Sequence, residues 1–447
     1  MNPEALFLGE LFRSLDLRGV NYAVMRNSET LPQSLGGSDL DLLVDGQTGV
    51  EEIVRISDDV AMRLGGKCVS RYKTEAMVLC YGGRHSNGGQ WGLHIDIFPG
   101  FSYFGIPYFD AATALSGRVR ERDSFYRLTG LSNVASLLKE LLFNGRTKKN
   151  YYQEARDYYQ DCPNEVESVL THCYGKVGWK EIFSMLKKEL GKDDLRVISK
   201  KIRKRLLLFY LNRHGVVKTA WVRMANLLQR LKRVLVPPGF CVAFLGTDGS
   251  GKSTLIESIT EPIERMLHSK VHYEHLRPNM LPSLARLAGK PQKDGPTTDP
   301  HGGKVAGRIS SLVRFAYYYV DYVVGYWLKI FPILVKRPSM VFFDRYYYEY
   351  MIDPRRCAVR LPRGWARFWS WFIPKPDLIL CLGGNPEKIY ARKPETSLEE
   401  VRRQVAELKN FCERNKRAVW IDTTTNIESS RDAAIMAITE KMAARYK

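Results

Sequence analysis

The sequence predicts an α/β protein with more than one domain. The 447 residues exceed what one ordinary core needs, since domains usually have roughly 100–200 residues. Hydrophobic residues make up 45% of the chain, which allows a large core and excludes a fully disordered protein. Short apolar runs typical of strands occur together with segments of helical periodicity, so we expect sheets covered by helices.

The pattern changes twice along the chain and divides it into three parts. Residues 1–115 alternate short apolar runs with Gly-rich turns, which favours a small α/β domain with hairpins. Residues 116–235 have helical periodicity and form a basic helical region. Residues 236–447 begin with Pro-Pro-Gly at 237–239 and a strand, and include a polar segment at 290–304 that we expect to be a loop.

A strong positive charge narrows the choice of partners. The chain has 68 Lys and Arg against 48 Asp and Glu, a net charge of +20. This favours a phosphate-bearing or polyanionic partner, or an anionic membrane surface. The segment 195–246 contains no acidic residue and combines basic residues with an apolar face formed by Trp221, Met224, Leu228, Leu231 and Leu235. Such a helix can lie on an anionic membrane or bind nucleic acid or a polyanionic glycan, or it can simply connect two domains.

We expect a cytoplasmic protein, peripheral at the inner face of a membrane. The eight cysteines form no CxxC pair, which favours a reducing compartment, and the N-terminal residues do not resemble a signal peptide. The apolar segment 315–335 is interrupted by Asp321 and Lys329, with Pro332 near its end, so we interpret it as a core helix and not a membrane span.

A phosphate-binding loop is the most specific motif. The apolar run 240–245 is followed by GTDGSGKST and then by a helical pattern at 254–267. The loop comprises Gly246, Gly249, Ser250, Gly251, Lys252, Ser253 and Thr254. Glycines let backbone N–H groups surround a phosphate at a helix N-terminus, lysine reaches the β- and γ-phosphates, and the serine hydroxyl binds Mg²⁺. We therefore expect ATP and Mg²⁺ here.

The segment 236–447 resembles the thymidylate kinases and their relatives. Besides FLGTDGSGKSTL, the matching segments are SMVFFDRYYYEY at 339–350, PDLILCLGGNPEKIYARK at 376–393 and AVWIDTTTN at 418–426. The resemblance implies that Asp344 helps to hold Mg²⁺ and that Arg345 lies beside the acceptor. It also implies that Arg392 is a lid arginine that stabilises charge on the transferred phosphoryl group.

The acceptor side departs from that family. Asp248 matches the acid of the loop near the acceptor, and it is our candidate base for a hydroxyl acceptor. However, Tyr322 stands where the family has an arginine that grips the acceptor phosphate, and YYEYMIDPRRC replaces its thymine-reading positions. We therefore expect an acceptor other than thymidylate.

Carboxylates mark a second candidate site. Asp39 and Asp41 form an Asp-x-Asp pair that period two puts on one face of a strand, and Asp96 lies in a second apolar run. Clustered carboxylates suit Mg²⁺. Residues 18–110 resemble the minimal nucleotidyltransferases of the polymerase-beta type, which implies a metal-binding triad of Asp39, Asp41 and Asp96. Arg26-Asn27-Ser28 stands where that family has its glycine motif; a solvated acidic hairpin is the alternative.

Three functions remain open at this point. The resemblances imply an ATP-dependent phosphotransferase with a nucleotidyltransferase-like domain. It would act on a sugar, glycan end or lipid-linked saccharide in bacterial surface-polysaccharide assembly. The alternatives are a nucleic-acid end-processing kinase and nucleotidyltransferase, for which the sequence has the charge but no binding motif, and a nucleotide-gated scaffold.

Overall fold

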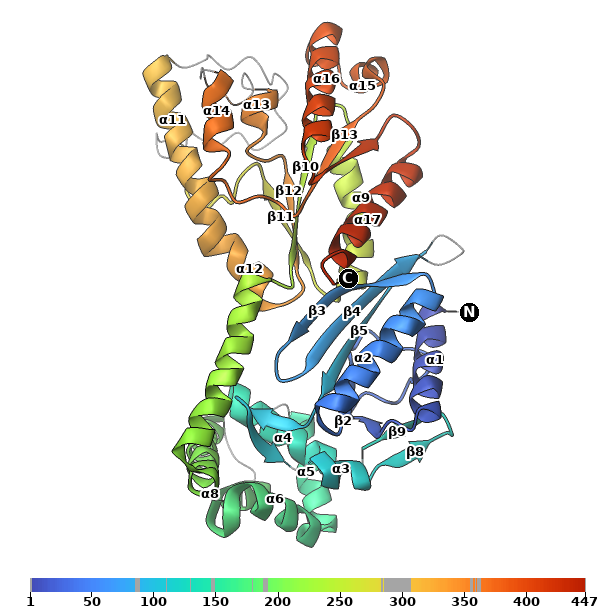
Figure 1. The fold of residues 1–447 in the computed structure, drawn as a ribbon, viewed down its shortest axis with the longest axis vertical. Coiled ribbons are helices and arrows are strands. Elements are labelled where there is room, and N and C mark those ends of the chain that lie inside the picture. The colour runs from blue at the N-terminus through green and yellow to red at the C-terminus, as the bar shows by residue number, and fades with distance from the viewer. Residues whose placement is uncertain are drawn as a thin grey trace. The chain divides into compact units, whose positions relative to one another are not determined.

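The computed structural model describes residues 2–84, 89–109, 111–128, 130–145, 149–178, 180–187, 192–282, 284, 307–353, 357, 359 and 363–446. These residues form two compact units, Met1–Leu235 and Val236–Lys447, and both are mixed α/β as predicted (Figure 1). The segment 290–304, expected to be a loop, lies outside the described residues.

A seven-stranded mixed sheet forms the centre of the first unit. Its strands, in sheet order, are β3 (Gly66–Lys73), β4 (Met77–Arg84), β5 (Gln90–Phe98), β2 (Leu40–Val44), β1 (Tyr22–Val24), β9 (Phe125–Arg127) and β8 (Val119–Glu121). The pairs β2–β5 and β1–β9 are parallel and the other pairs are antiparallel. Strands β8 and β9 belong to this sheet although they come from the region that the sequence predicted to be helical.

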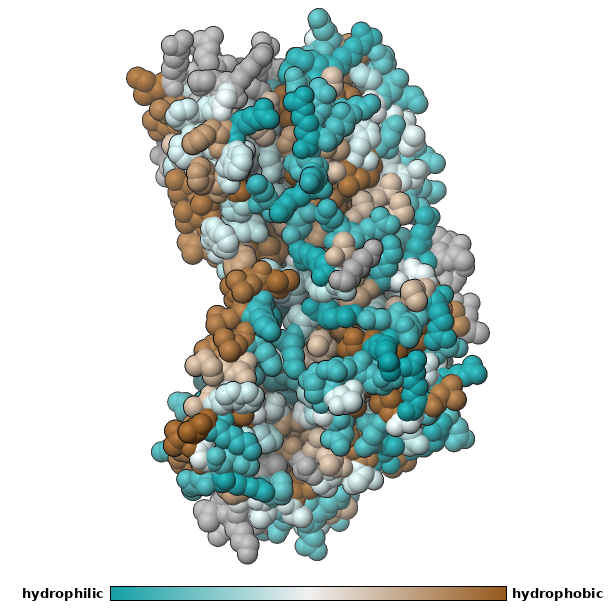
Figure 2. Space-filling model, in the orientation of Figure 1, coloured by the Kyte–Doolittle hydropathy of each residue, from teal (hydrophilic) through white to brown (hydrophobic). Residues whose placement is uncertain are grey.

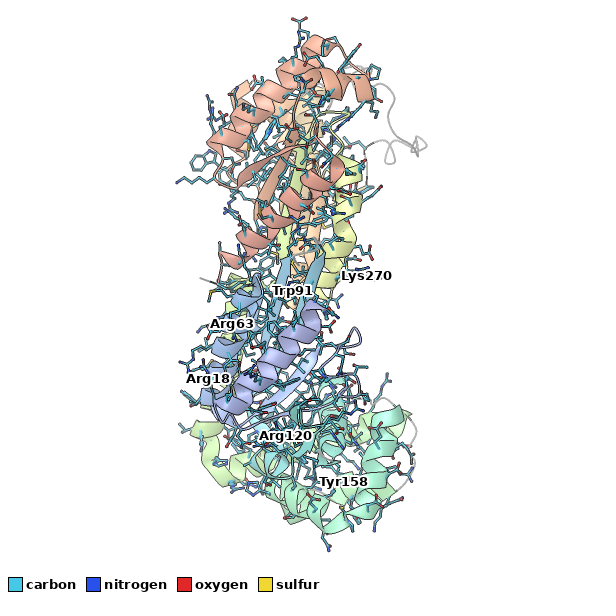
Figure 3. All side chains as sticks on the ribbon, turned by 90° about the vertical axis from the view of Figure 1, so that its right-hand side faces the viewer. Arg18, Arg63, Trp91, Arg120, Tyr158 and Lys270 are labelled. Carbon is cyan, nitrogen blue, oxygen red and sulfur yellow. The ribbon has the colours of Figure 1, made fainter. Side chains whose placement is uncertain are left out.

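Alternation along the strands separates two apolar cores. Leu40, Leu42 and Val44 of β2 share one core with α1 (Pro3–Leu17) and α2 (Gly46–Arg63), whereas Leu43 belongs to the core on the opposite face. Ion pairs attach α1 and the residue after it to their surroundings (Figure 3): Glu10 contacts Arg63 of α2 at 3.5 Å, Arg18 contacts Glu52 of α2 at 2.9 Å, and Arg120 of β8 contacts Asp16 at 2.9 Å.

The second core of this unit gathers the helices of the middle region. They are α3 (Ala111–Ser116), α4 (Leu131–Asn144), α5 (Lys149–Asp161), α6 (Pro163–Gly178), α7 (Lys180–Lys187) and α8 (Lys192–Leu235), together with the hairpin β6 (Phe101–Tyr103) and β7 (Ile106–Phe109). The helical period that the sequence shows in this region puts a stripe of leucines on one face of α4, and its members Leu137, Leu138, Leu141 and Leu142 are buried. Helix α8 has a break at Gly215, whose φ of 78° and ψ of 170° are not helical.

A five-stranded parallel sheet forms the centre of the second unit. Its order is β11 (Val271–His275), β12 (Met340–Asp344), β10 (Phe240–Gly246), β13 (Leu378–Gly383) and β14 (Ala418–Asp422). The three central strands are buried along their whole length, which explains their continuous apolar sequences. Arg445 holds the start of β10, because it donates to Gly239 O at 2.8 Å and pairs with Asp377 at 2.6 Å.

Helices cover both faces of this sheet (Figure 1). On one side lie α9 (Lys252–Leu267) and α17 (Ile427–Ala443), which contact each other. The other face carries η1 (Asp321–Ile330), α12 (Phe331–Lys336) and α16 (Leu398–Arg414), preceded by α11 (Arg308–Val320). The remaining helices are α13 (Glu349–Ile352), α14 (Arg363–Trp369) and α15 (Pro386–Arg392).

The apolar segment 315–335 is helical, as predicted, but only one side of it is covered. Phe315, Tyr322 and Ile330 are buried against the sheet. The opposite side exposes Ile309, Leu312, Val313, Val320, Val324, Trp327 and Leu328 along α11 and η1 (Figure 2). Within the described residues, no helix has the length and hydrophobicity needed to cross a membrane.

Candidate functional site

The phosphate-binding motif lies at the carboxyl end of the central strand β10. Because β12 and β13 flank β10 while the chain order runs β10, β11, β12, the strand order reverses at this strand. Ligands of open parallel sheets bind at such a reversal, beyond the carboxyl ends of the strands. The register pairs Phe244 with Asp344, so Asp344 ends its own strand beside the loop.

The glycines of the loop are required by its conformation and packing. Gly249 and Gly251 both have φ of 78°, which L-residues adopt only with strain. A Cβ atom on Gly246 would lie 2.6 Å from Ser250 Oγ and 2.8 Å from Leu382 O. Gly251 also precedes the first residue of α9, so the loop ends at the N-terminus of a sixteen-residue helix. The partial positive charge of that terminus favours an anion.

Lys252 is buried, and its ammonium group donates to Gly246 O and Thr247 O, both at 2.8 Å. Burial and the neighbouring Arg345 lower the pKa of Lys252 to about 7. A bound anion would favour the charged form and reverse this shift. The lysine therefore lies inside the loop with its charge only partly compensated.

Three acids surround the two cations of the loop. Arg345, which has φ of 72°, contacts Asp248 at 2.7 Å and Glu349 at 2.9 Å. Asp344 Oδ2 accepts from Tyr273 at 2.9 Å, whereas its buried Oδ1 has no hydrogen-bond partner among the described residues. Although burial raises the pKa of Asp344, the hydrogen bond from His275 and the charge of Lys252 lower it to about 2. Asp344 is therefore ionised at neutral pH.

Helix α15 brings Arg392 to the loop. Its Nη1 donates to Thr423 O at 2.9 Å and lies 4.0 Å from the position of a Cβ on Gly251. The carbonyl of Ile389, also in α15, lies 2.7 Å from the Cβ position of Gly249. The structure therefore brings Lys252, Asp344, Arg345, Asp248 and Arg392, predicted from separate motifs, to the same end of one sheet.

The hydrogen-bond donors and oxygen ligands at this loop fit a nucleoside triphosphate and a magnesium ion. Buried Ser250 Oγ and Thr247 Oγ1 lack hydrogen-bond partners among the described residues, and buried polar groups normally have them. Ser253 and Thr254 are exposed in the first turn of α9. Ser253 Oγ and Asp344 Oδ1 would be the groups that hold Mg²⁺, directly or through water.

On the acceptor side, the positions singled out in η1 belong to the core. Tyr322 is fully buried and donates to Leu276 O at 2.7 Å. Asp321 is also fully buried, pairs with Arg277 and accepts from the backbone N–H groups of Met280 and Leu281, both at 2.9 Å. These residues hold the segment after β11 against η1, and neither side chain reaches the loop through a contact among the described residues.

The N-terminal carboxylates meet on one face of the first sheet. Register places Asp41 of β2 beside Asp96 of the parallel strand β5, and Asp39 comes directly before β2. His94, two residues before Asp96, contacts Asp39 at 3.3 Å and Asp96 at 3.1 Å. The face is the one opposite α1 and α2, so it is turned toward α4.

Cationic side chains neutralise this cluster. Arg26 donates to Asp41, whose side chain is only 4% exposed. Burial alone would lower the pKa of His94, but Cys80 and the hydrogen bond to Asp96 raise it to about 11. Lys139 of α4 lies 4.5 Å above the Phe98 ring, and burial and Arg26 lower its pKa. Because Asp41 is paired with Arg26, and Asp39 and Asp96 with His94, a metal ion held by the three carboxylates would compete with these two side chains.

The second half of α8 differs on its two sides. Arg230 pairs with Glu75 at 2.9 Å, Arg233 lies 5.0 Å from the Tyr72 ring, and Arg203, in the first half, donates to Leu142 O at 2.7 Å. The predicted apolar face is exposed (Figure 2). The exposed fractions of its side chains range from 48% for Leu231 to 81% for Leu235, with Trp221 at 70%.

No model of a protein family matches this sequence, and no curated protein matches it. The resemblance to thymidylate kinases and to nucleotidyltransferases therefore rests on the sequence motifs.

Several residues of both sites were not predicted from the sequence. Glu349 and His94 are the most important, because Glu349 pairs with Arg345 and His94 bridges Asp39 and Asp96. A signal for each exists: Glu349 follows Arg345 by four residues, and His94 alternates with Asp96 along one strand. Tyr273 and His275 lie on a different strand, β11, and only the sheet order brings them to Asp344.

Replacing Asp41 tests whether the N-terminal cluster is ion-paired. Asp41→Asn leaves Arg26 without its charged partner, so we expect a loss of about 1–3 kcal/mol in the free energy of unfolding. Asp59→Asn, which breaks an exposed pair with Arg18 at 3.8 Å, should change it by less than about 1 kcal/mol. Denaturant unfolding of the full chain measures both. Stabilisation by Mn²⁺ that Asp41→Asn abolishes would instead support a metal triad.

Proposed function

We propose that this protein is an ATP-dependent phosphotransferase whose catalytic domain, residues 236–447, is a P-loop kinase of the thymidylate kinase type. The observation that supports it is the convergence of Lys252, Asp344 and Arg345 at the carboxyl end of β10, around buried hydroxyl groups that have no hydrogen-bond partner in the part of the chain that the structure describes.

Each charged group has a role in phosphoryl transfer. ATP would supply the phosphoryl group, and Mg²⁺ would be held by Ser253 and Asp344. Lys252 and Arg392 stabilise negative charge on the phosphoryl oxygens, which is the main contribution that a protein makes to this reaction. Asp248 is the nearest carboxylate for accepting the proton of a hydroxyl acceptor, and Arg345 holds it in place at 2.7 Å.

The acceptor in this proposal is a sugar, glycan end or lipid-linked saccharide, as in bacterial surface-polysaccharide assembly. Thymidylate kinases have an arginine that grips the acceptor phosphate at the position of Tyr322. Here the tyrosine side chain is buried in the core and offers no phosphate ligand, which supports an acceptor other than thymidylate. Nucleic-acid end processing is the second candidate, favoured by the net charge of +20. A nucleotide-gated scaffold would need the same loop but none of the charges that stabilise transfer.

Nucleotidyl transfer is not part of the proposal. The cluster of Asp39, Asp41 and Asp96 is paired with Arg26 and His94, and two-metal chemistry needs carboxylates that are available to metal ions. The first unit then contributes recognition or attachment. Helix α8 of this unit exposes an apolar face, and this face together with the lysines of the helix suits the surface of an anionic membrane.

Removing the lysine of the loop tests the kinase assignment. Lys252→Ala should lower phosphoryl transfer at least about a hundredfold, because a cation that stabilises the transferred group is lost. Lys270→Ala, an exposed lysine of the same unit, should have no effect. Turnover of ATP with sugars, lipid-linked saccharides, RNA ends and thymidylate, followed by mass spectrometry, measures this and identifies the acceptor. We expect thymidylate to be poor; unchanged turnover in Lys252→Ala would reject the assignment.

The affinity for ATP should depend on pH through Lys252. Its pKa is about 7 in the free protein, and bound phosphates favour the charged form, so binding takes up a proton above that pH. Affinity should therefore fall as pH rises above about 7, by at most about tenfold per pH unit. Calorimetry in buffers of different ionisation enthalpy measures the proton uptake. Lys252→Arg, which stays charged, should show no such slope; a wild-type affinity independent of pH would contradict the prediction.

Membrane association should depend on the apolar face of α8. Trp221→Ser with Leu228→Ser should weaken binding to vesicles of phosphatidylcholine and phosphatidylglycerol about tenfold or more, since each side chain loses apolar burial. Leu17→Ser with Met62→Ser is the matched control, because both residues are apolar, belong to the same unit and are at least as exposed as Trp221 and Leu228. Co-sedimentation of the full chain measures both. Equal binding by all three proteins would return α8 to a connecting role.

A further inference from the structure

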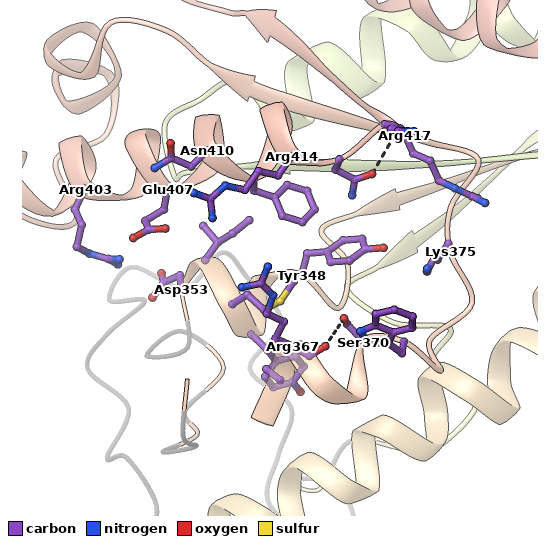
Figure 4. Close-up of a pocket in the computed structure, with 18 of the residues that line it drawn as sticks. Tyr348, Asp353, Arg367, Ser370, Lys375, Arg403, Glu407, Asn410, Arg414 and Arg417 are labelled. Atoms are coloured by element: carbon purple, nitrogen blue, oxygen red, sulfur yellow. Dashed lines mark hydrogen bonds between the residues drawn. The ribbon is translucent and has the colours of Figure 1, made fainter. Parts of the chain in front are cut away.

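A large cavity of about 920 Å³ lies in the second unit, apart from the phosphate-binding loop (Figure 4). Helix α16 forms one wall, and the segment 348–353 with α14 and the residues after it forms the other. Its volume is within the range of sites that bind small organic molecules. None of the residues that carry the kinase chemistry lines it.

The cavity is basic, and most of its cations have no acidic partner. Arg367, Lys375, Arg414 and Lys416 line it, and no ion pair among the described residues includes them. By contrast, Arg403 is held by Glu400 at 2.6 Å, and Arg417 donates to Pro376 O at 3.0 Å. In Figure 4 the side chains of Arg367 and Arg414 lie on opposite walls of the cavity. Unpaired guanidinium groups on two walls suit an anionic group between them.

The lining also offers aromatic surfaces and hydrogen-bond acceptors. Trp371 is 77% exposed, and Tyr348 and Phe411 lie deeper in the wall. Glu407 and Asn410 of α16 add oxygen atoms that can accept hydrogen bonds. A ligand that satisfies this lining has hydroxyl donors, an apolar face and only a few negative charges.

The cavity adjoins the acceptor side of the phosphate-binding loop. Ile352 and Asp353 line both this cavity and a small cavity formed by Gly246, Asp248 and Arg345. Gln404 of α16, which lines only the small cavity, donates to Asp353 at 3.2 Å and so holds this shared wall in place. A ligand in the large cavity therefore lies next to the acceptor side of the loop, separated from Asp248 and Arg345 by Ile352 and Asp353.

We propose that this cavity binds the saccharide chain of the acceptor, an oligosaccharide that carries sparse carboxylate or phosphate groups. The inference rests on the proposed kinase function and specifies its substrate class. Sparse charge is favoured because Asp353, Glu400 and Glu407 also line the cavity and would repel a nucleic acid, which carries a phosphate at every residue. Sugar hydroxyls, by contrast, use these carboxylates as acceptors.

Binding of defined oligosaccharides to the full chain tests the proposal. The probe is a fluorescently labelled hyaluronate hexasaccharide, which has a carboxylate on alternate sugars; maltohexaose and hexauridylate serve as the neutral and nucleic-acid probes. We expect hyaluronate to bind more tightly than either. Arg367→Gln with Arg414→Gln should weaken it about tenfold or more, because two charge-assisted hydrogen bonds are lost. Both arginines are exposed, so the variant should keep the wild-type melting temperature.

Lys409→Gln is the matched control, because Lys409 is exposed on α16 but does not line the cavity. It should leave hyaluronate binding unchanged. Equal affinities of the wild type and the double arginine variant would overturn the proposal, and tighter binding of hexauridylate would replace the saccharide with a nucleic acid. ATP binding, measured on the same proteins, reports on the loop separately. Saccharide binding without ATP binding would reject the kinase function and keep the cavity, whereas the reverse would reject the cavity alone.

Discussion

The concentration of positive charge at the end of β10 is the constraint on which the second unit depends. Lys252, Arg345, Arg392 and the N-terminus of α9 lie around one loop, and the burial of Lys252 and Arg345 makes the repulsion between these two cations costly. Asp248 and Glu349 hold Arg345, while Asp344 takes its hydrogen bonds from Tyr273 and His275 on β11. Asp248 and Glu349 fix the position of Arg345, while Lys252 donates only to backbone carbonyl groups. This is the arrangement on which the proposed binding of phosphate groups depends.

The first unit concentrates negative charge instead, and this charge is neutralised by cations of the protein itself. Its carboxylates converge as the strand pattern required, yet Arg26 and His94 neutralise them within the protein. Two units with related charge clusters therefore differ in what they need from a ligand. In the second unit an anion would find Lys252 and the N-terminus of α9 beside cations that are already held by acids, whereas in the first unit a cation would have to compete with groups already bound to the carboxylates.

Much of the fold followed from the sequence, since β10, α9 and the leucine stripe of α4 have strong periodicity and clear boundaries. The convergence of Asp41 and Asp96 also followed from alternation. What the sequence did not indicate depends on sheet order and on side-chain partners. Tyr273 contacts Asp344 only because β11 pairs with β12. No local sequence pattern predicts that Arg26 pairs with Asp41. The large basic cavity was missed because α14 and α16 are separate in the sequence and only packing brings their cations together.

The attachment of Arg445 to the start of β10 affects how the chain folds during synthesis. The first unit is one continuous stretch of chain, so all its strands and helices are available once residue 235 has left the ribosome. The central strand of the second unit, in contrast, is synthesised early but is completed late, because β13, β14, α17 and Arg445 all come from the last quarter of the chain. Until β13 is synthesised, β10 can pair with β12 but its other edge lacks its neighbour. An open edge on a buried apolar strand favours aggregation, so this interval is the step at which the second unit needs protection.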